Sequence, residues 1–183
     1  MTSRIDVKHI PKGQSFFQMG VDHLPTCSYK TRFLFKLNEN TIVRRFFVQK
    51  ILKRRLGLHN SVSFNNKFRT TSNNLRVGKN VGLADTLILS YAPVSIGDNC
   101  SFSYRNVLIT STHDFSDFSK VIVKPITIGN NVWITTNVTI LPGVTIGDNT
   151  VIGAGAVVTS DIPSGVFAAG NPCKVIKEID FKK

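Results

Sequence analysis

An aliphatic β-branched residue recurs at every sixth position between residues 122 and 163. The row consists of Ile122, Ile128, Ile134, Ile140, Ile146, Ile152 and Val158. Four residues after each comes a second row of mostly small or β-branched side chains, Val132, Val138, Val144, Thr150, Ala156 and Ile162. A fixed short period of this length is typical of a solenoid, and a period of six indicates a parallel β-helix. An α-helix is excluded because the 3.6-residue period is absent, and turn residues interrupt any simple alternation.

Each hexad is expected to form one short strand and one tight corner. Three hexads, about 18 residues, then close one triangular coil, and the aliphatic side chains stack along its axis. Glycine and asparagine are expected at the corners, where they adopt the positive φ that β-branched residues resist. Asn130, Asn131, Asp148 and Asn149 fit corners for this reason.

A fainter form of the same period precedes this stretch. Its aliphatic and aromatic positions are Leu58, Phe64, Val77, Leu83 and Leu89 and, after one extra residue, Ile96, Phe102 and Leu108. Fourteen residues separate Leu108 from Ile122, two more than two hexads. That surplus, with the sequence HDFSDFSK at 113–120, predicts a loop that leaves the solenoid. Loops on a rigid scaffold often carry function.

The predicted fold is all-β, a parallel β-helix over 58–163 with an N-terminal arm over 1–57 and a closing segment over 164–183. Residues 1–40 show no clear period and are interpreted as loops and short strands. Residues 41–56 mix apolar and basic side chains at spacings of three and four, which predicts an amphipathic helix ended by Gly57. We favour a helix that caps the open end of the solenoid over one that lies on an anionic membrane, and the two roles are compatible. No groove-reading motif accompanies the charge, so nucleic acid is not an expected partner.

Composition adds few constraints. The 183 residues suffice for one main domain, and no apolar run approaches the length of a membrane span. Residues 1–17 are mixed and polar, without an evident secretory signal. Three widely separated cysteines predict neither a disulfide framework nor a metal site, which favours a cytoplasmic protein, with peripheral contact at the inner membrane face as an option. The net charge of +12 suits an anionic partner, or reflects Lys and Arg gathered in the arm.

His113 is the candidate catalytic residue. The other histidines, His9, His23 and His59, lie in the arm or at the first hexad's corner. His113 stands where the repeat breaks, at the lip of the expected loop, and a neutral imidazole is the usual general base near pH 7.

These features together resemble the hexapeptide-repeat acyltransferases, and within them the maltose, galactoside and nodulation-type O-acetyltransferases. The matching motifs are His113-Asp114 at the loop, VWI at 132–134, ILPGVTIGDN at 140–149, VIGAGAVVT at 151–159 and AGNP at 169–172. The resemblance covers about residues 96–179. The segment RRFF at 44–47 is similar to the entry of colanic-acid-type exopolysaccharide acetyltransferases.

The resemblance implies a left-handed β-helix, a homotrimer, and acetyl-CoA bound between neighbouring subunits, with no metal. It implies that acetyl passes to a hydroxyl of a sugar or of a surface-polysaccharide or glycolipid precursor. His113 matches the family's general base, which takes the hydroxyl proton as the oxygen attacks the thioester. Residues matching the family's coenzyme A contacts are Trp133, Thr136, Ala154, Thr159, Ser160, Lys174 and Lys177. Two positions depart from the family: Thr135 replaces a Gly, and Ser160 replaces a common Lys.

The acceptor side matches the family less well. The candidate substrate residues are Asp85 and Asp114. Asp85 stands nearest to an Asn that galactoside-type relatives use, and Asp114 is also expected either to orient His113 or to cap the loop. Tyr104, Arg105 and Phe115 are further candidates for an acceptor pocket. Three other functions stay open: an N-acyltransferase acting on an amino sugar, a non-catalytic scaffold, and a γ-class carbonic anhydrase, although repeat-region histidines are too few for its zinc site.

Overall fold

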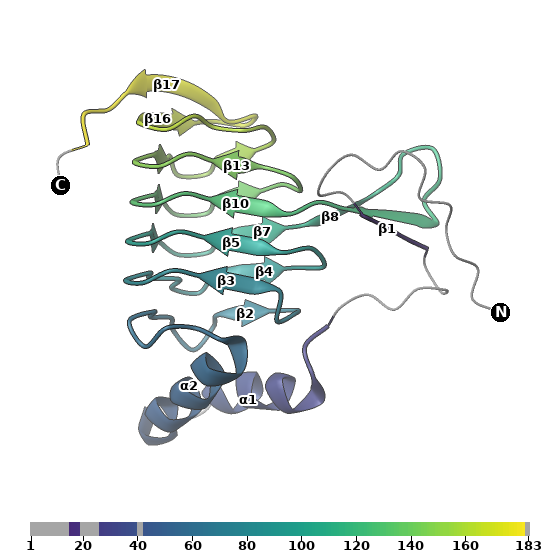
Figure 1. Cartoon of the computed structure of the whole chain (residues 1–183), viewed down its shortest axis with the longest axis vertical. Coiled ribbons are helices and arrows are strands. Elements are labelled where there is room, and N and C mark those ends of the chain that lie inside the picture. The colour runs from purple at the N-terminus through teal and green to yellow at the C-terminus, as the bar shows by residue number, and fades with distance from the viewer. Residues whose placement is uncertain (1–14, 19–25, 40–41, 182–183) are drawn as a thin grey trace.

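The computed structural model describes residues 15–18, 26–39 and 42–181. It is a left-handed parallel β-helix of triangular coils (Figure 1). Face 1 contains β3 (Leu75–Val77), β5 (Val94–Ile96), β10 (Ile126–Ile128) and β13 (Thr145–Ile146). Face 2 contains β6 (Ser101–Phe102), β11 (Trp133–Ile134), β14 (Val151–Ile152), β16 (Val166–Ala169) and the antiparallel β17 (Lys174–Glu178). Face 3 contains β2 (Arg69–Thr70), β4 (Leu87–Leu89), β7 (Val107–Ile109), β12 (Thr139–Ile140) and β15 (Val157–Val158).

The inward aliphatic row predicted from the sequence is the core of the later coils. Ile128 pairs with Ile146, Ile134 with Ile152 and Ile140 with Val158, each eighteen residues apart and each almost wholly buried. The second row, represented by Val132, Val138 and Val144, is buried as well. Rigid β-branched side chains, stacked from coil to coil, thus fill the interior of the solenoid.

Asparagine and aspartate build the corner between faces 1 and 2 in two ways. Asn99, Asn131 and Asn149 adopt positive φ, and their side-chain amides bond one another from coil to coil, at 3.3 Å between Asn99 and Asn131 and 2.9 Å between Asn131 and Asn149. Asn130 and Asp148 do not adopt positive φ, so that part of the prediction is wrong. Their side-chain oxygens instead accept backbone N–H groups of the coil below, with Asp148 Oδ1 2.6 Å from Asn130 N.

The glycine that precedes each of these pairs is required for close stacking rather than for positive φ. A Cβ at Gly129 would lie 2.8 Å from the backbone nitrogen of Asp148, closer than real Cβ atoms approach. Neighbouring coils stack so closely at this corner that the position requires a residue without a side chain.

Two residues of the predicted inward rows do not point into the solenoid. Ile122 belongs to β9 (Lys120–Val123), which pairs antiparallel with β8 (Ser111–His113), and the solenoid resumes only at Ile126. Its six-residue distance from Ile128 is a coincidence of the Lys124-Pro125 connection. In β4 the fully buried residue is Ile88, not the predicted Leu89, because the corner after Leu83 is one residue shorter than a hexad.

The extruded loop is present and is longer than the predicted surplus of two residues. Residues that bond between the coil before the loop and the coil after it are 32 apart in the sequence, against 18 for the next pair of coils. The coil that carries the loop therefore contains one inserted hairpin. β8 and β9 form this hairpin with residues 114–119 at its tip, and β1 (Ser15–Gln18) adds a third strand (Figure 1). The hairpin leaves the corner between faces 3 and 1.

Two helices close the N-terminal end of the solenoid (Figure 1). α2 (Ile42–Leu56) is the predicted helix, and its Val48, Leu52 and Leu56 are buried in one core with Phe64 and Phe68 of the first coil. α2 thus packs against the first coil of the solenoid. Full burial of a leucine such as Leu52 stabilises the fold by roughly 1.5–3 kcal/mol.

α1 (Tyr29–Glu39) was not predicted, since residues 1–40 were interpreted as loops and short strands. Of its three fully buried residues two are polar, Thr31 and Asn38 beside Phe35, which weakens the helical period. Ser28 caps its start, with Ser28 Oγ accepting the Thr31 N–H at 3.3 Å. Within the described residues, neither helix is long and apolar enough to cross a bilayer.

Candidate active site

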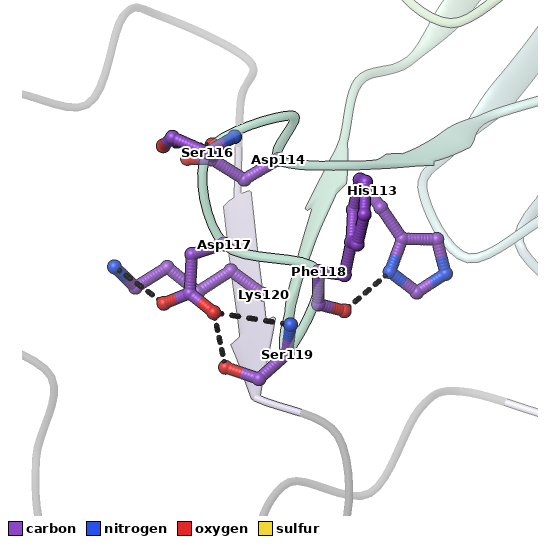
Figure 2. Close-up of polar contacts among 7 residues, drawn as sticks. All are labelled: His113, Asp114, Ser116, Asp117, Phe118, Ser119 and Lys120. Carbon is purple, nitrogen blue, oxygen red and sulfur yellow. Dashed lines mark hydrogen bonds and ion pairs between the residues drawn. The ribbon is translucent and has the colours of Figure 1, made fainter.

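His113 ends β8 with its ring exposed at the base of the hairpin tip. Its Nδ1 lies 2.8 Å from the backbone oxygen of Phe118, across the tip (Figure 2). A carbonyl oxygen can only accept, so Nδ1 carries the proton and Nε2 is the basic nitrogen. Nε2 points away from the hairpin, free to receive a proton from a bound molecule.

A tandem repeat, Asp-Phe-Ser twice, holds the hairpin tip in shape. Asp114 Oδ1 accepts the Ser116 backbone N–H at 2.8 Å and the Ser116 hydroxyl at 2.5 Å. Asp117 Oδ1 does the same for Ser119, at 3.1 and 2.6 Å, and Asp117 Oδ2 pairs with Lys120 Nζ at 3.0 Å (Figure 2). The second turn sets the position of the Phe118 carbonyl that orients His113.

These bonds favour the ionised carboxylates. The hydroxyl and N–H of Ser116 lower the pKa of Asp114. The Ser119 hydroxyl and the Lys120 ammonium lower the pKa of Asp117 to about 2. Asp114 is therefore engaged in its own turn, and the Phe118 carbonyl occupies the His113 nitrogen that an orienting carboxylate would bind, so of its two expected roles Asp114 takes loop capping.

Five of the seven matched coenzyme A positions lie on face 2 and at the corner between faces 2 and 3. Trp133 is half exposed on β11, and its Nε1 donates to Ser103 Oγ at 3.3 Å. Along face 2, Trp133 is in register with Val151, Phe167 and then Lys177, so the tryptophan and the β17 lysines line one face. Thr136 and Ala154 are exposed at neighbouring coils of the adjoining corner, where the Gly155 N–H donates to the Thr136 carbonyl at 3.0 Å. Lys174 and Lys177 are exposed and supply positive charge at the end of this column.

The remaining two, Thr159 and Ser160, are exposed at the corner between faces 3 and 1. That is the corner from which the His113 hairpin departs, two coils further along the solenoid. Within one chain, face 3 therefore separates His113, Thr159 and Ser160 from Trp133, Thr136 and Ala154. A single elongated ligand that lies along one corner meets both groups only if a second chain supplies one of them.

Thr135, which replaces the family's glycine, turns its hydroxyl onto the neighbouring coil. Its Oγ1 donates to the Ile152 carbonyl at 2.6 Å. The side chain is thus bonded within the stack, and the exposed position of this corner is held by Thr136.

The acceptor-side candidates are also divided. Asp85 Oδ1 accepts the Arg105 backbone N–H at 2.6 Å, so its carboxylate holds the corner between faces 2 and 3, where Arg105 adopts a φ of 62°. Tyr104 is exposed at that corner, whereas Phe115 is at the hairpin tip and 88% exposed. One chain does not bring these three residues and Phe115 together.

The three cysteines are free and buried. Burial raises the pKa of each thiol, so none has the character of an activated nucleophile. Among the described residues, no three His, Cys, Asp or Glu gather as a metal ion would need.

Comparison with known proteins bears on this arrangement. Residues 125–160 match the family model "Bacterial transferase hexapeptide (six repeats)". The galactoside O-acetyltransferase of Escherichia coli K12 is 47% identical over 114 residues, which cover 58% of this chain and 55% of that protein. A solved maltose O-acetyltransferase from Clostridium difficile 630 is 36% identical, with a TM-score of 0.75 over 83% of this chain and 86% of that one. The chain belongs to the hexapeptide-repeat acetyltransferases.

A second solved member of the hexapeptide-repeat acetyltransferases is a galactoside acetyltransferase in complex with coenzyme A. It is 33% identical, with a TM-score of 0.70 over 82% of this chain and 80% of that one. The alignment with the E. coli enzyme spans about half the length of either protein. Sequence reasoning named His113 and the matched positions as candidates; it did not name the Phe118 carbonyl, since no side chain marks a backbone acceptor.

Proposed function

We propose that this protein transfers an acetyl group from acetyl-CoA to a hydroxyl of a sugar or sugar-containing precursor. The observation that carries the proposal is the state of His113, whose Nδ1 is bound by the Phe118 carbonyl so that Nε2 is a free base at the lip of an extruded hairpin. Relatives named as galactoside and maltose O-acetyltransferases support an acetyl donor and a sugar acceptor.

Direct transfer fits the residues of this chain. The thioester supplies an activated acetyl carbon and a thiolate leaving group. His113 Nε2 takes the proton of the acceptor hydroxyl as its oxygen bonds to that carbon, and the imidazolium returns a proton to the departing sulfur. Holding both reactants beside the base makes the step effectively unimolecular. No acyl-enzyme is required, which agrees with cysteine thiols that are buried and have raised pKa values.

A trimer with active sites between subunits is part of the proposal. His113 and Thr159 are at one corner of the chain, while Trp133, Thr136 and Ala154 are on the far side of face 3. Two chains packed side by side would bring one chain's hairpin to the other's face 2, where Lys174 and Lys177 offer cations to the phosphates of coenzyme A. Free cysteines suit the reducing cytoplasm, where we place the reaction.

An acceptor screen tests the proposal. Purified protein is incubated with acetyl-CoA and a panel of mono- and oligosaccharides, amino sugars included, while thiol release is followed and mass spectrometry reports a gain of one acetyl group. His113→Ala is expected to lower kcat about 10²- to 10⁴-fold, with unchanged thermal stability because the ring is exposed. Equal turnover by His113→Ala with a genuine acceptor would remove the base assignment. Acetylation of amines but not hydroxyls would make the enzyme an N-acyltransferase.

A further inference from the structure

The helical cap leaves large apolar side chains exposed to solvent. Tyr29 and Phe33 of α1 are 82% and 52% exposed, and Phe47 and Ile51 of α2 are 75% and 45% exposed. α2 thus has two apolar sides, since Val48, Leu52 and Leu56 already fill the core. A role in capping explains the buried side and leaves the other unexplained.

Basic side chains surround these apolar groups. Lys50, Arg54 and Arg55 are exposed on α2 and Lys30 is exposed on α1, and none of the four is ion-paired within the described residues. Residues 26–60 contain nine Lys or Arg and one Glu, and so hold eight of the chain's twelve net positive charges. We name Tyr29, Lys30, Phe33, Phe47, Lys50, Ile51, Arg54 and Arg55 the cap surface.

The cap surface is hollowed rather than flat. Tyr29, Phe33 and Ile51 line a hollow of about 200 Å³ between α1 and α2, with Lys30 and Arg55 at its border. A second hollow of about 490 Å³ lies beside Phe47, bordered by Lys50 and Lys53. The hollow between α1 and α2 combines an apolar floor with cations, as an acyl chain and an anionic headgroup together require, and the one beside Phe47 adds an aromatic ring among lysines.

The place of the cap in the fold adds to this. α1 and α2 lie across the end of the solenoid, not along one of its faces (Figure 1). Chains packed side by side with parallel axes, as in the proposed trimer, would direct all their caps the same way, and several weak contacts would add as avidity.

We infer that the cap surface docks the protein on an anionic lipid bilayer. The exposed aromatic and aliphatic side chains enter the interface while the lysines and arginines contact the negative headgroups. Avidity rests on the proposed trimer, but the surface itself is complete in one chain. Nucleic acid offers the charge without an apolar layer, so the exposed Phe47 distinguishes the two.

Flotation with vesicles tests the inference on the full chain, without acetyl-CoA. Wild type is expected to float with phosphatidylcholine vesicles that contain about 30% phosphatidylglycerol, and not with phosphatidylcholine alone, at about 0.15 M salt. Lys50→Glu/Arg54→Glu is expected to weaken binding at least about tenfold. Its matched control, Arg76→Glu/Lys79→Glu, changes the same charge at exposed positions of a lateral face and is expected to float like wild type.

A second variant and its matched control test the apolar side chains of the cap surface. Phe47→Ser is expected to weaken binding several-fold, while Phe115→Ser, at the hairpin tip and even more exposed, is expected to leave it unchanged. Failure of wild type to float, or flotation that needs the cations but not Phe47, overturns the inference, and the latter marks a general polyanion site. Melting curves of all variants show that they are folded. Because no acetyl transfer is measured, either outcome leaves the proposed reaction to its own test.

Discussion

The coils after the hairpin and the coils before it are built from the same hexads but closed differently. After the hairpin, paired positions are eighteen residues apart, or sixteen where β14 meets β16, and the inward positions are nearly all Ile, Val or Ala. Before it, paired positions are eighteen residues apart between β2 and β4 and nineteen or twenty elsewhere, and buried polar residues appear inside: Thr70, Ser72, Thr86, Ser90, Asn106 and Thr110.

Buried hydroxyls form hydrogen bonds inside the coils before the hairpin. The Ser72 and Ser90 hydroxyls bond each other at 2.7 Å, and Thr110 Oγ1 accepts the N–H groups of Tyr91 and Ala92 at 2.8 and 3.0 Å. An extra residue at a corner leaves backbone groups without partners, and these side chains provide them. The coils after the hairpin, the regular half, therefore depend on packing. The coils before it, the irregular half, depend on packing and on specific hydrogen bonds.

The largest expected effect is in the regular half. Ile140→Ala, at a fully buried position between Leu108 and Val158, is expected to lower the free energy of unfolding by about 2–5 kcal/mol. Ile140→Val, which keeps the β-branch, should cost about 0.5–1.5 kcal/mol. Urea denaturation measures both. Equal losses for the two variants would contradict a tightly packed stack.

A smaller effect is expected in the irregular half. Thr110→Val leaves the Tyr91 and Ala92 N–H groups buried without acceptors and is expected to cost about 1–3 kcal/mol in urea denaturation. The same change at Thr139, whose half-buried hydroxyl forms no hydrogen bond within the described residues, should stay within about 0.5 kcal/mol. If Thr139→Val cost as much, loss of the hydroxyl alone would explain the result.

The smallest effect concerns the hairpin that separates the halves. The pKa of Asp117 is lowered to about 2, so its support of the tip is complete above the ordinary aspartate pKa near 4 and is lost as pH falls toward 2. The Ser119 backbone N–H donates to Asp117 Oδ1, so its amide exchange, taken relative to an unprotected amide at the same pH, is expected to accelerate over that range, and an NMR titration should place the carboxyl midpoint near 2.

Asp117→Asn tests the same carboxylate by removing it. It is expected to abolish that pH dependence and to lower kcat a few-fold near neutral pH, because the Phe118 carbonyl would orient His113 less firmly. Asp180→Asn, at an exposed acid outside the hairpin, is the control. A midpoint near 4 for the Asp117 carboxyl in the wild type would contradict the two hydrogen bonds that Ser119 donates to it.

The same contrast explains what the sequence could predict. Eighteen-residue coils repeat one physical requirement, so Ile128 to Val158 could be assigned from spacing alone. Ile122 and Leu89 were misassigned because a six-residue count cannot distinguish an inserted hairpin or a short corner from a continuing hexad. α1 escaped because Thr31 and Asn38 occupy inward positions that pattern analysis assumes apolar.

In the candidate site, side chains with a distinctive chemistry could be named from the sequence. Their hydrogen-bond partners and their positions relative to one another could not. His113 was identified by its place at a break in the repeat. That Asp114 bonds Ser116 while Phe118 orients the imidazole depends on the three-dimensional path of the tip. The separation of His113 from Trp133 by face 3 likewise follows from how many corners lie between them, which becomes visible only when the coils are closed.

β17 limits the length of the molecule. The earlier strands of face 2 pair in parallel with the strand of the next coil, and an uncovered edge of this kind is also where fibrils grow. β17 turns back antiparallel on β16 and is exposed along all five residues, with Lys174 and Lys177 on the outermost strand. Charged side chains on a reversed strand deter a further chain from adding there, so a repeat that could propagate without limit is held to a fixed number of coils.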